Sequence, residues 1–127
     1  MKKREAEFTI YFRHWLKANP MHTAAFELKQ TTADSLPFNS VSDHQINALL
    51  AVSSSGLLYK IPDDSRGIKP FDMVYFRNEL SYIVVKFPKH FEIISINTWI
   101  LERGRSKRKS LTSERAKEIS VISVKIK

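Results

Sequence analysis

The hydrophobic residues near the start of the chain recur with helical spacing. Phe8, Tyr11, Phe12, Trp15 and Leu16 stand at i, i+3, i+4, i+7 and i+8, which predicts an amphipathic helix over about residues 3–18. The pair Asn19-Pro20 ends this helix, because the residue before a proline disfavours helical dihedrals.

A different pattern follows at residues 24–31, which alternate and contain neither Gly nor Pro. The pleat of a strand would place Phe26 and Leu28 on one face and Glu27 and Lys29 on the other. One face then packs against a core, and the other carries an acid beside an ammonium group.

The rest of the chain predicts further helices and strands in alternation. The polar residues of the stretch 31–40, together with Pro37, are typical of a loop. We expect helices from Ser42 to about Ala51 and from Ser113 to about Ile119, and a strand followed by a short helix within residues 91–101. We expect strands at residues 57–61 and 121–126, and a hairpin of residues 71–76 and 81–87 joined by a turn at 77–79.

Length and composition favour one domain. A chain of 127 residues, 43% of them hydrophobic, can bury a single core, so we expect one domain over residues 1–127. The fold class that the pattern predicts is α/β, with a central mixed sheet flanked by helices. The chain has no Cys, which is typical of a reducing compartment, and we expect neither a signal peptide nor a membrane span.

The charge changes the expected partners. Lys and Arg number 21 against 13 Asp and Glu, for a formal net charge of +8, and such an excess favours a polyanion such as nucleic acid. Five of the cations fall within residues 103–109. A run of this kind can also be a solvated loop, but on so basic a protein nucleic-acid binding is the favoured interpretation.

The pair Glu27 and Lys29 is the first candidate for chemistry. A carboxylate can hold a hard divalent cation that activates water against a phosphodiester. A lysine on the same strand face can orient that water or offset charge in the transition state. Surface strands also use Glu and Lys as solvated partners, so the pair by itself leaves both interpretations open.

Five segments in order extend the pattern around this pair: Phe26-Glu27-Leu28-Lys29-Gln30-Thr31, Leu36-Pro37-Phe38, His44-Gln45, Gly56-Leu57-Leu58-Tyr59 and Arg108-Lys109-Ser110-Leu111. Together they resemble the core of RecU-type Holliday junction resolvases, nucleases of the PD-(D/E)xK superfamily. The resemblance implies a restriction-endonuclease-like fold, a Mg²⁺- or Mn²⁺-dependent hydrolase that cuts four-way or other branched DNA in recombination, and a homodimer. It also implies a cytoplasmic protein of a bacterial or phage-infected cell.

The same resemblance implies roles for single residues. Glu27 would be a metal ligand, Lys29 would orient the attacking water, and Gln45 would face the same metal or phosphate from the following helix. For Gln45 a second explanation stays open, since Ser42 and Gln45 have the spacing of a helix capping box.

The chain departs from the family in one respect: the family expects an Asp on the strand before Glu-x-Lys, and no Asp precedes position 34 here. Two acids could replace it. Glu5 continues the apolar stripe of the first helix, although an acid there also suits the helix dipole. Asp72, in Lys69-Pro70-Phe71-Asp72, would reach Glu27 if the hairpin 71–87 packed beside the Glu27 strand, and it could equally be a turn residue.

The predicted nucleic-acid contacts form a basic rim around the site. They are Lys2, Lys3, Arg4, His44, Lys60, Arg66, Lys69, Arg103, Arg105, Lys107, Arg108 and Lys109. Two other functions remain open: a nucleic-acid-binding module without catalysis, and a related nuclease acting on other DNA or RNA substrates.

Overall fold

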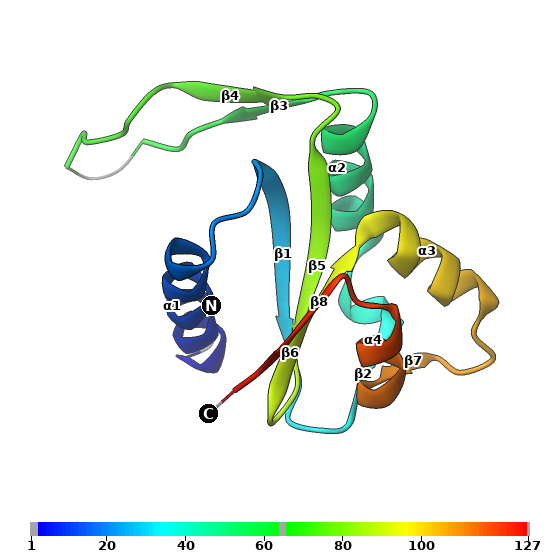
Figure 1. Cartoon of the computed structure of the whole chain (residues 1–127). Coiled ribbons are helices and arrows are strands. Elements are labelled where there is room, and N and C mark those ends of the chain that lie inside the picture. The colour runs from blue at the N-terminus through cyan, green and yellow to red at the C-terminus, as the bar shows by residue number, and fades with distance from the viewer. Residues whose placement is uncertain (1–2, 64–65, 127) are drawn as a thin grey trace.

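The structure is a computed structural model that describes residues 3–63 and 66–126, apart from the side chains of residues 3–5. It is an α/β fold in which a mixed four-stranded sheet lies between helices (Figure 1). The sheet strands are β1 (Ala24–Gln30), β5 (Leu80–Lys86), β6 (His90–Ser95) and β8 (Ile122–Lys125), in the order β1-β5-β6-β8. Among the described residues, no helix is both long and apolar enough to cross a membrane.

Pairing within the sheet is parallel at one edge and antiparallel elsewhere. β1 and β5 run parallel with Ala24 opposite Leu80, whereas β5–β6 and β6–β8 are antiparallel. The chain passes from β1 to β5 through helix α2 (Asp43–Ser53) and a separate two-stranded sheet. β1 therefore forms one edge of the main sheet and β8 forms the other.

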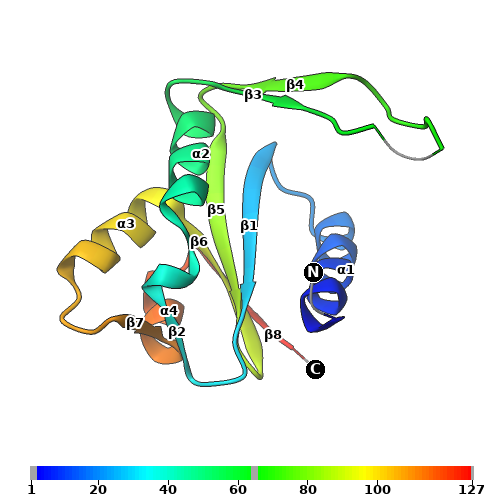
Figure 2. The same cartoon turned by 180° about the vertical axis from the view of Figure 1, so that it is seen from behind.

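Helices cover both faces of this sheet. Helix α1 (Lys3–Ala18) packs on one face through Phe8 and Phe12, which contact Phe91. α2, α3 (Ile96–Arg105) and α4 (Ser113–Ile119) lie on the other face, as the two opposite views show (Figures 1 and 2). Because both faces are covered, residues 81–85 of β5 are all buried, without the alternation of a half-exposed strand.

Two short pairs of strands complete the fold. β2 (Ser35–Pro37) pairs with β7 (Ser110–Thr112), and a 3₁₀ turn (Phe38–Ser40) follows β2. β3 (Leu57–Lys60) pairs with β4 (Met73–Phe76), and this pair projects from one end of the main sheet (Figure 1). We call residues 57–76, of which the structure describes all but 64 and 65, the β3–β4 arm.

The predicted helices are confirmed, whereas one strand pairing is wrong and the expected loop at residues 31–40 contains β2 and the 3₁₀ turn. α1, α2 and α4 occupy the expected stretches, and Ser42 and Thr112 cap α2 and α4. The predicted hairpin of residues 71–87 does not form, since β4 pairs with β3 and β5 joins β1 and β6. The apolar run of β5 requires cover on both faces, which the helices on either side of the main sheet provide and an isolated hairpin would not.

Candidate functional site

The Glu27–Lys29 pair lies on the edge strand β1, facing α2. Phe26 and Leu28 pack into the hydrophobic cluster beneath α1, so the alternation of the strand turns Glu27 and Lys29 to the opposite face. Figure 2 shows β1 with α1 on one side and α2 on the other. The predicted division of this strand into a packing face and a polar face is confirmed.

Three side chains from two elements meet on this polar face. Lys29 Nζ lies 3.4 Å from Glu27 Oε2, and Gln45 Nε2 in the first turn of α2 donates a hydrogen bond of 3.1 Å to the same oxygen. The Glu27 and Lys29 side chains are 27% and 20% exposed. The carboxylate is thus held by an ammonium and an amide and still reaches solvent.

The start of α2 fixes the position of Gln45. Its backbone N–H donates to Ser42 Oγ at 3.1 Å, and its side-chain Oε1 accepts from the Ser42 backbone N–H at 3.0 Å. This is the complete capping box. The two explanations for Gln45 both hold, because its amide oxygen caps the helix while its amide nitrogen contacts Glu27.

A pocket of about 350 Å³ opens beside this cluster. Its lining includes Glu27, Lys29 and Gln45, together with Phe8 and Thr9 from α1. Glu27 is the one carboxylate among the described residues that line it. The first helix therefore contributes a wall to the site even though it packs on the other face of the sheet.

Glu5 and Asp72 were the two further predicted metal ligands, and the structure tests the position of Asp72 only. The backbone of Glu5 belongs to the first turn of α1, but its side chain is outside the described part. Asp72 lies on the β3–β4 arm, where its 81% exposed carboxylate is 3.3 Å from Lys69 Nζ. The expectation that Asp72 joins Glu27 is wrong, because it required the hairpin of residues 71–87 and β4 pairs with β3 instead. Across the described residues, no group of three or more His, Asp or Glu side chains gathers in a metal-binding arrangement.

The predicted basic rim divides into separate groups. Lys2 and the side chains of Lys3 and Arg4 are outside the described residues. The cluster at 103–109 lies in the last turn of α3 and the loop after it, beside the start of α2, where Arg103 Nη1 is 3.7 Å from Asp43 Oδ1. The exposed His44 follows Asp43 in the first turn of α2.

The arm cations lie near the other end of α2. Lys60 is exposed on β3, Arg66 is exposed farther along the arm, and Lys69 is paired with Asp63 at 2.6 Å. β3 follows the C-terminal end of α2, and an 11-residue helix spans about 16 Å. These cations therefore do not continue the 103–109 cluster.

A second pocket, of about 640 Å³, joins the 103–109 cluster to α2. Arg103, Lys107, Arg108 and Lys109 line it together with Ser42 at the helix start. Gln45 lies one turn along the same helix and lines the Glu27 pocket. The start of α2 thus separates a cationic pocket from the candidate site by a single helical turn.

Arg115 on α4 was not among the predicted site residues. Its guanidinium donates to both carboxylate oxygens of Glu102, at 2.9 and 3.1 Å, and the hydrogen bond from Arg115 lowers the pKa of Glu102 against the opposing effect of burial. Both residues line a further pocket of about 880 Å³ with Lys107 and Arg108. Arg115 follows the cationic run 103–109 by six positions, and this proximity in the sequence could have indicated that it belongs to the same basic region.

The fold and the site define an α/β protein with a Glu-x-Lys pair on the edge strand of a mixed sheet. Comparison of the chain with protein-family models, with curated proteins and with solved structures found no match. The chemistry of the site therefore carries the functional argument.

Proposed function

We propose that the protein is a Mg²⁺- or Mn²⁺-dependent endonuclease that cuts branched DNA. The observation that carries the proposal is the meeting of Glu27, Lys29 and Gln45 at one pocket, from a strand and the helix that follows it. An acid, an amine and an amide in this arrangement suit the hydrolysis of a phosphodiester. We also propose that the mixed sheet and its helices form a restriction-endonuclease-like core.

Glu27 and Glu5 are the proposed metal ligands. Mg²⁺ in proteins is usually held by one or two carboxylates, with water and phosphate oxygens completing its shell. Glu27 lines the pocket, and Glu5 precedes the pocket residues Phe8 and Thr9 by three and four positions on α1, a spacing that keeps residues on one helix face. The ion, when bound, would polarise a phosphoryl oxygen and lower the pKa of the attacking water.

Lys29 would act on the water and the phosphate, and Gln45 would act on the metal ligand Glu27. Lys29, beside Glu27, would orient the water and offset charge that develops on the phosphate. Gln45 is a positioning residue, because its oxygen is engaged in the helix cap while its nitrogen holds the Glu27 carboxylate. Its role is to fix the rotamer of the ligand.

The basic residues beside α2 would bind the DNA backbone. Arg103, Lys107, Arg108 and Lys109 line the pocket next to the helix start, where backbone N–H groups add to the attraction for phosphate. Recognition of a branch by backbone charge and shape needs no base-edge contacts. Two symmetric cuts require two sites, so the proposed function includes a homodimer.

Cleavage of a labelled four-way junction, with Mg²⁺ and with EDTA, tests the proposal. The unmodified protein should cut only with the metal, while Glu27→Gln should bind the junction and leave it intact. Glu5→Gln should lose cleavage as well, and Glu118→Gln, the same change at an exposed acid on α4, should keep it. No metal-dependent cutting by the unmodified protein, or full activity of Glu27→Gln, would contradict the nuclease.

One observation favours a second candidate, a DNA-binding module without catalysis. Glu27 is the single carboxylate of the described pocket lining, and Lys29 is near enough to neutralise it. Such a module would bind the junction with steep salt dependence and leave it uncut. A nuclease for other DNA or RNA would instead cut linear duplex or RNA as readily as the junction.

A further inference from the structure

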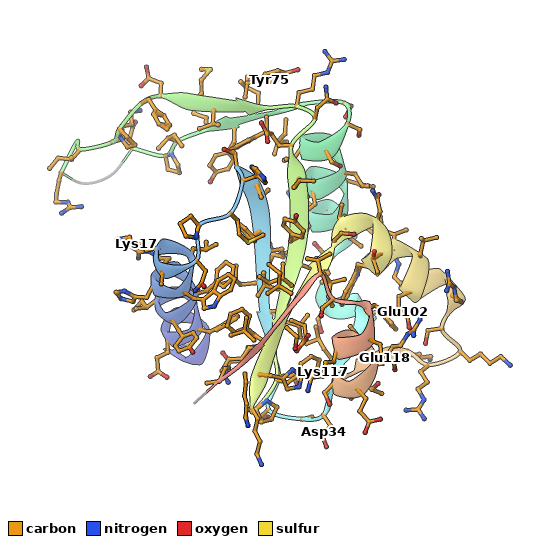
Figure 3. The ribbon with its side chains drawn as sticks, in the orientation of Figure 1. Lys17, Asp34, Tyr75, Glu102, Lys117 and Glu118 are labelled. Atoms are coloured by element: carbon orange, nitrogen blue, oxygen red, sulfur yellow. The ribbon has the colours of Figure 1, made fainter. Side chains whose placement is uncertain are left out.

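The β3–β4 arm exposes an unusual amount of apolar surface. Figures 1 and 2 show it projecting beyond the rest of the fold, and Figure 3 labels Tyr75 on it. Six large hydrophobic side chains on the arm are each 50% exposed or more: Leu58, Tyr59, Ile68, Phe71, Met73 and Tyr75. A patch of this kind marks an interaction surface more often than it marks bare solvent exposure.

The strand register gathers part of this surface on one side of the arm. Leu58 is opposite Tyr75, and Lys60 is opposite Met73, in the antiparallel β3–β4 pair. Opposed residues share a face, and positions two apart on a strand share it too. Leu58, Met73 and Tyr75 therefore form an apolar face with Lys60 beside it. A two-stranded sheet with such a face is marginally stable unless something covers it.

The charge of the arm favours a protein as its partner over DNA. Residues 57–76 contain three cations and three carboxylates, so the arm is formally neutral while the whole chain carries +8. All of the excess positive charge lies outside the arm. Two copies of so basic a chain repel each other over most of their surface, and the arm is a place where they can approach without that cost.

The charged groups of the arm can also complement a second copy. Asp63 and Asp72 share Lys69, at 2.6 and 3.3 Å, yet their side chains remain 82% and 81% exposed. Each carboxylate can therefore accept a further cation. Lys60, exposed beside the apolar face, is a suitable donor from a neighbouring arm.

We propose that the β3–β4 arm is the dimerisation element of this protein and that its occupant is the arm of a second copy. The apolar faces of two arms meet about a two-fold axis, so that each face is covered by its equivalent. Lys60 of one copy then approaches the acids of the other. The proposal rests on the homodimer of the proposed function and identifies its contact, and it is tested by mass without any cleavage, so a dimer that forms elsewhere is distinguished from a protein that does not cut.

Sedimentation equilibrium of the full chain tests the arm directly. The unmodified protein should sediment at twice 14.7 kDa. The double variant Leu58→Glu, Met73→Glu should weaken the dimer by about 30-fold or more, as expected for removal of a central apolar contact. Both side chains are more than half exposed, so the change should leave the melting temperature of the monomer nearly the same.

Leu101→Glu provides the matched control, because Leu101 on α3 is 61% exposed against 62% for Leu58 and lies outside the arm. This variant should remain dimeric. A monomeric unmodified protein would overturn the proposal, and so would an arm double variant that is folded and still dimeric. Loss of junction binding by the double variant, with its mass unchanged, would assign the arm to DNA and overturn the proposal as well.

Discussion

The side-chain nitrogen of Gln45 donates a 3.1 Å hydrogen bond to Oε2 of Glu27, although 18 positions separate the two residues. The oxygen of the same amide accepts from the Ser42 backbone N–H, which fixes the orientation of the amide. One side chain thus closes the helix cap and holds the candidate metal ligand. The geometry of the site therefore depends on how α2 begins.

Substitutions at Gln45 and Ser42 should separate these two roles. Gln45→Ala removes half of the capping box and the partner of Glu27, whereas Ser42→Ala removes the other half of the box and leaves Glu27 in place. Each should lower the free energy of unfolding by about 1 kcal/mol, measured by urea denaturation. Gln45→Ala alone should also slow single-turnover cleavage, by about 10- to 100-fold. Equal cleavage by the two variants would leave Gln45 as a cap and nothing more.

Lys29 should matter for cleavage and little for folding or binding. Its contact with Glu27 lies at a partly exposed site, where an ion pair contributes about 1 kcal/mol or less. Lys29→Met should slow cleavage by about 10²- to 10³-fold if the ammonium stabilises the transition state. Junction affinity, measured by fluorescence anisotropy in Ca²⁺, should change less than about twofold. An equal loss of affinity and cleavage would assign Lys29 to binding instead.

The cationic loop should determine how DNA binding responds to salt. Removal of two phosphate contacts reduces the slope of log K against log salt by about 1.8, so Arg108→Gln with Lys109→Gln should flatten the plot by that amount. Lys117→Gln with Lys125→Gln removes the same charge from exposed positions on α4 and β8. This control should keep the slope nearly unchanged. Identical slopes for the two double variants would mean that the loop makes no specific phosphate contact.

Local features of the sequence predicted much of this fold. The stripe that includes Phe8 and Phe12 predicted α1 because a helix must bury such a stripe, and both residues are buried against the sheet. Alternation predicted that Glu27 and Lys29 share a face, and the spacing of Ser42 and Gln45 predicted the start of α2. In each case the residues that determine the local structure lie within about two helical turns or one strand of one another.

Features that depend on distant segments could not be predicted in this way. The local pattern of β5 is compatible with pairing to β4, but in the structure β5 pairs in parallel with β1, which lies more than fifty positions earlier in the chain. The expectation that Asp72 lies near Glu27 required β4 to pair with β5, and it failed because β4 pairs with β3. Glu92 is a similar case, since its fully buried carboxylate accepts from Ser123 on β8, a neighbour that no local pattern indicates.

The Glu102–Arg115 pair should give the protein a measurable acid sensitivity. Arg115 on α4 donates two hydrogen bonds to Glu102 on α3, and this lowers the pKa of the Glu102 carboxyl in the folded state. The stabilisation is complete above the ordinary carboxyl pKa and declines as the pH falls, because the unfolded chain then takes up the proton first. Glu102→Gln keeps the shape and removes the titrating group. The urea midpoint of unfolding should therefore be higher for the unmodified protein than for Glu102→Gln at about pH 7. The two midpoints should become equal as the pH falls toward about 3. A difference that stays constant over this range would mean that the pair contributes packing and no charge.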